Sequence, residues 1–168
     1  MKRLIPTLLL LVLLAPGAAA QDETTRLKEA LENGLVSFSY SYLSDGDIPV
    51  TGKGQVTVQG SRYYTEGNGM KIWCDSTLRW TLDVTAKEAY IETVASSPDI
   101  LSNPVPYLNG LSGLKSENGT ISGIYEAGGH KIRFSITDIK ISPKTEVLGV
   151  FSFDVATLDK SWVLTDLR

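Results

Sequence analysis

The chain has 168 residues with 16 basic and 19 acidic side chains, one histidine and one cysteine. The net charge of −3 provides no basic surface for a nucleic acid, so a nucleic-acid partner is not expected. The single cysteine, Cys74, cannot form an internal disulfide, and we interpret it as a small buried apolar side chain.

The N-terminal segment has the order of a secretory signal peptide. Lys2 and Arg3 precede an aliphatic run at residues 8–14, and small residues follow at 18–20. The run is shorter than the roughly 20 residues that a membrane-spanning helix needs. We therefore predict that residues 1–20 are a cleavable signal peptide.

The remaining residues, 21–168, have the length of a single domain. They carry 14 basic and 19 acidic side chains, a net charge of −5, because the leader removes two basic residues and no acidic one. A soluble domain built around one apolar core is expected.

The first predicted elements are a helix and a strand. Residues 22–34 form an amphipathic pattern in which Leu27, Ala30 and Leu31 share one stripe. At residues 35–43 the period changes to two, with apolar and aromatic side chains alternating with serines. This alternation predicts a strand with one buried face.

Short strands and turns then recur at regular intervals, which is typical of a meander of hairpins. The predicted strands lie at residues 52–59, 62–66, 70–74, 78–84, 89–94, 119–126, 130–140, 146–154 and 161–166. Residues 96–114 interrupt this rhythm with three prolines among apolar side chains, and we predict one or two short helices there.

The expected fold class is therefore mainly β. We predict a curved antiparallel sheet of about ten strands that forms an open half-barrel, covered on its concave face by a few helices. A one-layer sheet with few helices leaves more apolar surface than those helices can cover, which favours a cavity for an apolar ligand.

No residue pattern indicates catalysis or a metal site. His130, the only histidine, lies beside a predicted hairpin turn, a setting typical of a solvated strand end. One Cys and one His cannot complete a zinc shell, and no serine lies in a G-x-S-x-G elbow. We expect no catalytic residue, no metal and no cofactor.

Part of the sequence resembles the LolA family of periplasmic lipoprotein carriers. The resemblance rests on residues 54–64, on residues 70–82 with the turn at Asp75 and the strand from Trp80 to Leu82, on residues 87–89, and on the ending 163–168, which is similar to Bacteroides-type carriers.

The resemblance implies an open, incomplete β-barrel with helices as a lid over a hydrophobic cavity. It implies a soluble periplasmic carrier that moves lipoproteins from the inner to the outer membrane. Its implied partners are acylated lipoproteins, an inner-membrane lipoprotein-releasing transporter and an outer-membrane acceptor, and a monomer is expected.

Strand alternation predicts which side chains line this lipid-binding cavity. They are Phe38, Tyr40, Val56, Val58, Tyr64, Met70, Ile72, Trp80 and Leu82. Two other hypotheses stay open: an envelope lipid-binding or stress-sensing module of the same fold without transport, and an esterase that would have to use His130.

Overall fold

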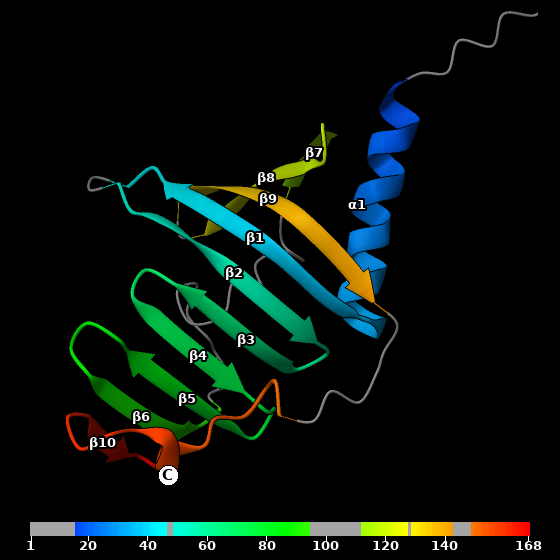
Figure 1. The fold of residues 1–168 in the computed structure, drawn as a ribbon. Coiled ribbons are helices and arrows are strands. Elements are labelled where there is room, and N and C mark those ends of the chain that lie inside the picture. The colour runs from blue at the N-terminus through cyan, green and yellow to red at the C-terminus, as the bar shows by residue number, and fades with distance from the viewer. Residues whose placement is uncertain (1–15, 47–48, 95–111, 128, 143–148) are drawn as a thin grey trace, which may run out of the picture.

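The computed structural model describes residues 16–46, 49–94, 112–127, 129–142 and 149–168. These residues form one open, curved sheet of ten strands in the order β10-β6-β5-β4-β3-β2-β1-β9-β8-β7 (Figure 1). The strands are β1 (Leu35–Ser44), β2 (Thr51–Gln59), β3 (Arg62–Gly67), β4 (Met70–Cys74), β5 (Leu78–Asp83), β6 (Glu88–Thr93), β7 (Ser112–Glu117), β8 (Thr120–Ala127), β9 (His130–Ser142) and β10 (Val163–Asp166).

The pairing of the strands confirms the predicted meander. Strands β1 to β6 pair as antiparallel neighbours in chain order, and β7 to β9 do the same. Strand β9 pairs with β1 and joins the two runs into one sheet. Strand β10 departs from the predicted antiparallel pattern, because it lies parallel to β6 at one edge.

Helices are fewer than the sequence predicted. The described residues contain one α-helix, α1 (Pro16–Asn33), and one short 3-10 helix, η1 (Val155–Thr157). Of the helices predicted at 96–114, residues 96–111 lie outside the described part, and 112–114 belong to strand β7 instead. The turn Asn118-Gly119 explains this difference. Its two residues have φ values of 51° and 75°, as a two-residue hairpin turn requires, and they connect β7 to β8.

The strand predicted at residues 146–154 is wrong for its described part. Residues 149–151 form a turn and 152–154 are irregular, with Gly149 at φ 94°. The carboxylate of Asp154 then accepts a hydrogen bond of 2.9 Å from the backbone N–H of Ala156 and caps η1. This short polar cap competes with strand pairing, so the alternating apolar residues of the segment do not join the sheet.

Helix α1 begins earlier than predicted, at Pro16 rather than at residue 22, so it includes the last residues of the expected leader. It ends at Asn33, and the backbone N–H of Gly34 donates a 2.7 Å hydrogen bond to the carbonyl of Ala30. Among the helix side chains that the structure describes, Leu27 and Leu31 are buried and Ala30 packs against the same core, as the predicted stripe requires.

The apolar side of the sheet changes face between its two halves. Phe38 lies opposite Val56, and the pairing continues this surface to Ile72 in β4; we call it the Phe38 face. In the next hairpin Ile72 lies opposite Thr81, so Trp80 points to the other side of the sheet. We call that side the Trp80 face.

Strands β5 and β6 bury their apolar residues on the Trp80 face. Trp80 lies opposite Ile91 and Leu82 lies opposite Ala89, and all four side chains are buried. The sheet therefore has two separate apolar surfaces, one on each face.

A turn at Asp75 sets this change of face. The carboxylate of Asp75 accepts hydrogen bonds of 2.8 Å from the backbone N–H groups of Thr77 and Leu78. This turn places Cys74 opposite Arg79. A shift of one residue in this register would move every side chain of β5 to the opposite face.

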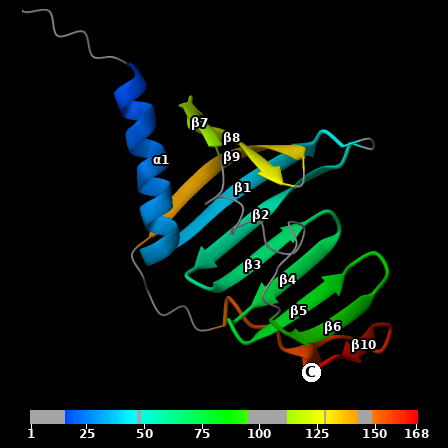
Figure 2. The same ribbon diagram turned by 180° about the vertical axis from the view of Figure 1, so that it is seen from behind.

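Each apolar face has its own cover. On the Phe38 face, Leu27 and Leu31 of α1 belong to the same buried cluster as the residues of β1, β2, β8 and β9. On the Trp80 face, residues 149–162 cross the other half of the sheet, and the ring of Phe153 lies 4.7 Å from that of Trp73. Figure 2 shows α1 beside β1 and β9, while the C-terminal segment stays near β4 to β6.

Because the two apolar surfaces are separate, substitutions in them should act independently. We expect Ile136→Val on the Phe38 face and Ile91→Val on the Trp80 face each to lower the free energy of unfolding by about 1 kcal/mol. The double variant should lose the sum of the two values to within about 0.5 kcal/mol. Urea unfolding of the four proteins measures this.

A pair within one surface provides the matched comparison. Ile121 lies directly opposite Ile136, so Ile121→Val should couple to Ile136→Val. Strong coupling between Ile136 and Ile91 instead would show that the two surfaces form one core.

Candidate functional site

The nine predicted cavity residues divide between the two faces. Six of them share the Phe38 face: Phe38, Tyr40, Val56, Val58, Met70 and Ile72. The other three, Tyr64, Trp80 and Leu82, lie on the Trp80 face. The structure therefore does not bring all nine together, and the Phe38 face is the larger candidate surface.

Two glycines of β2 make room for tyrosine rings on the Phe38 face. Tyr40 lies opposite Gly54 and Tyr42 opposite Gly52. A Cβ atom at Gly52 would lie 2.5 Å from the Tyr42 ring, and one at Gly54 would lie 2.9 Å from the Tyr40 hydroxyl. The two rings stack with centroids 6.4 Å apart, and Tyr42 also packs 5.9 Å from Phe134. The result is a dense aromatic floor.

Helix α1 closes one end of this surface through a narrow contact. Its two buried leucines face Leu114, Ile121 and Ile136 across a small crevice. The crevice has a volume of about 10 Å³, which leaves room for no more than about one water molecule. A larger opening of about 130 Å³ lies beside the helix, between Arg26 and Ile139. The crevice under α1 therefore has no room for a bulky apolar ligand while the helix keeps this position.

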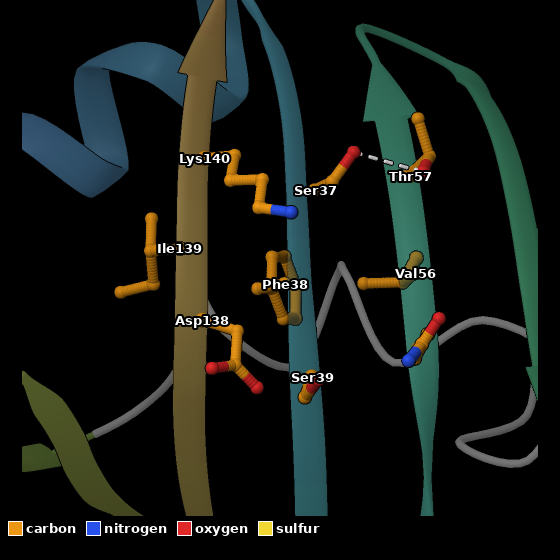
Figure 3. A pocket seen from close by; sticks show the side chains of 9 residues that line it. Ser37, Phe38, Ser39, Val56, Thr57, Asp138, Ile139 and Lys140 are labelled. Atoms are coloured by element: carbon orange, nitrogen blue, oxygen red, sulfur yellow. Dashed lines mark hydrogen bonds between the residues drawn. The ribbon is translucent and has the colours of Figure 1, made fainter.

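A hollow larger than either of these lies elsewhere, where β1, β2 and β9 meet. A β-bulge shifts the register between Ser37 and Ser39, and Asp138 has φ 55°. This groove has a volume of about 380 Å³ (Figure 3). Its lining residues are Ser37, Phe38, Ser39, Gln55, Val56, Thr57, Asp138, Ile139 and Lys140.

The chemistry of the groove suits hydrated polar groups rather than an alkyl chain. The hydroxyls of Ser37 and Thr57 form a hydrogen bond of 2.9 Å, drawn in Figure 3. The side chains of Asp138 and Lys140 contribute one charge of each sign. This groove was not predicted from the sequence, although the change of phase from Ile136 to Ile139 signals the bulge.

Aromatic side chains on the Trp80 face are occupied by the C-terminal segment. The ring of Tyr64 lies 5.0 Å from Trp73, which in turn contacts Phe153. The guanidinium of Arg62 lies 5.4 Å from the centroid of Phe151, and its Nη2 donates a 2.6 Å hydrogen bond to Gln59. Tyr64 therefore takes part in holding this segment rather than in lining the Phe38 face.

A small polar cluster borders the Phe38 face in β3 to β6. Tyr63 and Cys74 are buried, and Arg79 forms an ion pair of 2.8 Å with Glu92. Burial, and next the neighbouring Cys74, raise the pKa of Tyr63 to about 12, against an opposing effect of Arg79. Burial also raises the pKa of the Cys74 thiol, which keeps it protonated and unreactive at neutral pH.

Groups that would support an enzyme are sparse in the described part of the chain. His130 is exposed at the first residue of β9. No group of three or more His, Cys, Asp or Glu side chains in the described residues is placed to hold a metal ion. Among those residues, no helix combines the length and the apolar character of a membrane span.

The raised pKa of Tyr63 predicts a specific loss of stability in alkali. Its folded pKa of about 12 lies above the usual value of 10.0, so its contribution is complete below pH 10 and falls as the pH rises towards 12. We expect Tyr63→Phe to flatten the decline of unfolding free energy between about pH 10 and 12 relative to the original protein. Urea unfolding at stepped pH measures the two slopes.

Equal slopes for the original protein and Tyr63→Phe would contradict the assignment.

Comparison with known proteins does not assign this chain to a family. The sequence matches no protein-family model, and no curated protein is significantly similar to it. The resemblance to lipoprotein carriers therefore rests on the sequence motifs alone, and the activity it implies is a proposal.

Proposed function

We propose that this protein binds the acyl chains of lipidated proteins on its Phe38 face and carries them between the two membranes of a bacterial envelope. The observation that carries the proposal is the construction of that face. In the described residues it combines a continuous apolar and aromatic surface with helix α1, which Leu27 and Leu31 hold against one end of it.

The free energies involved are compatible with exchange of the helix for an acyl chain. Burial of two leucines stabilises the helix contact by about 3 to 6 kcal/mol. An acyl chain of about 14 methylenes gains roughly 11 kcal/mol when it leaves water, at about 0.8 kcal/mol for each methylene. An acyl chain can therefore compete with α1 for the Phe38 face.

The same balance permits release, because α1 re-covers the face when the chain leaves. A membrane offers the acyl chain a similar gain, so transfer between protein and membrane needs little net free energy. Such a carrier requires an inner-membrane transporter that loads the lipoprotein and an outer-membrane acceptor that receives it. The expected leader at residues 1–20 would direct the protein to the periplasm.

A lipid-binding or stress-sensing module without transport is the second candidate. The closed crevice under α1 supports this candidate, because a helix that moves only when a lipid binds can also signal the bound state to a partner protein. Transfer of bound cargo to acceptor vesicles distinguishes the two candidates.

Loosening the helix should strengthen cargo binding. We expect Leu27→Ala to increase affinity for a palmitoylated peptide roughly tenfold, because less apolar contact must be broken to open the crevice. Fluorescence titration with a labelled palmitoylated peptide measures this, and native mass spectrometry should recover the peptide with its acyl chain intact. The same peptide without the chain should not bind.

Arg26→Ala is the matched control, since Arg26 is an exposed neighbour on the same helix. It should leave the affinity unchanged. If Leu27→Ala and Arg26→Ala bind the peptide equally, the acyl chain does not enter under α1. Recovery of a deacylated peptide would instead support an esterase, and His130→Ala would then test its catalytic group.

A further inference from the structure

The two edge strands of the open sheet differ in how well they are protected against pairing with another strand. At the β7 edge, Lys115 and Glu117 supply charge, and the register with β8 shifts between Ser112 and Lys115. Charges and bulges are both devices that discourage edge pairing. Helix α1 also contacts β7.

The β10 edge is less protected. Strand β10 pairs continuously with β6 from Val163 to Asp166 without a shift, and the charge of Asp166 is paired with Arg168 at 2.6 Å. Val163 and Leu167 are 61% and 59% exposed, the highest values among the large apolar side chains of the described residues. Leu164, on the opposite face of the strand, is 47% exposed. This edge therefore exposes apolar side chains on both faces.

The hydrogen bonds from β10 to β6 determine which backbone groups of β10 point away from the sheet. The N–H of Val163 donates to the carbonyl of Lys87 at 2.9 Å, and that of Leu167 donates to Ile91 at 2.8 Å. Backbone groups alternate in direction along a strand, so the N–H and C=O of Leu164 and Asp166 point to the free edge.

These outward groups are self-complementary in one antiparallel register. When Thr165 lies opposite Thr165 of a second copy, Leu164 of each chain pairs with Asp166 of the other through both backbone bonds. In the same register, Val163 of each copy lies opposite Leu167 of the other copy. The two resulting Val163–Leu167 pairs lie on the same face of the joined sheet. A register centred on Asp166 would instead bring two carboxylates together. One centred on Leu164 would need the N–H of Trp162, which already bonds to Asp159.

We propose that two copies of this protein associate through antiparallel pairing of β10 about a two-fold axis at Thr165. The pairing would join the two sheets into one of twenty strands, since each copy contributes ten. A four-residue edge buries little area, so the dimer is weak and reversible. This inference departs from the monomer expected from the sequence and does not depend on the proposed lipid binding.

Disulfide trapping tests the register directly. Thr165→Cys places two thiols on residues whose Cα atoms are about 4.5 Å apart in the proposed pair, within the range of a disulfide. Under mild oxidation we expect most of this variant to form a covalent dimer on a non-reducing gel. Cys74 does not compete, because it is 0% exposed.

Leu164→Cys is the matched control on the same exposed strand. In the proposed register the two introduced cysteines are offset by two residues, with Cα atoms roughly 8 Å apart, too far for a disulfide. Equal trapping of both variants, trapping of Leu164→Cys alone, or trapping of neither would each overturn the proposal.

A charge exchange tests the same register without oxidation. Val163→Lys alone and Leu167→Glu alone should each weaken self-association roughly tenfold in sedimentation equilibrium, because each places a charge opposite an apolar side chain twice. The double variant should restore it, because each introduced lysine then lies opposite an introduced glutamate of the other copy. Failure of the double variant to recover would refute the Val163–Leu167 pairing.

Discussion

The register of the β4–β5 hairpin is the constraint on which the rest of the structure depends. Two short hydrogen bonds to the Asp75 carboxylate close this turn and place Cys74 opposite Arg79. Because side chains alternate along a strand, this single register decides that Trp80 faces away from Ile72. Every later apolar residue of β5 and β6 must then find its cover on the other side of the sheet.

This constraint explains why the chain needs two different covers. Helix α1 covers one end of the Phe38 face, and the segment at 149–162 packs on the Trp80 face through Phe151 and Phe153. The two covers are built differently. The C-terminal cover is held by aromatic stacking and a cation–π contact, whereas α1 relies on two leucines. Only the helix has the simple apolar contact that an alkyl chain can replace.

Much of the strand pattern could be predicted from the sequence, because alternation in β1 and turn chemistry such as Gly67-Asn68-Gly69 are local signals. Which apolar side chains share one face of the sheet could not be predicted, because this depends on a register that the geometry of one turn sets. That is why Tyr64, Trp80 and Leu82, which the alternation groups with Phe38, lie on the other face of the sheet. The strand β7 was missed although Asn118-Gly119 is a strong hairpin signal. The C-terminal segment was predicted wrongly because its aromatic alternation serves packing rather than sheet pairing.

The β3–β4 hairpin stands where the two apolar surfaces overlap. Tyr63 and Ile72 are buried on one side of it, while Tyr64 and Trp73 stack on the other. Strands β1 and β2 can exchange their serines and threonines for other hydrophilic residues, because one of their sides faces water. The middle hairpin has no such free side except at its Glu66–Lys71 end, where an exposed ion pair faces water. Over evolutionary time it should accept the fewest changes of residue type, so variation among related chains would be lowest there because both of its sides pack against other parts of the protein.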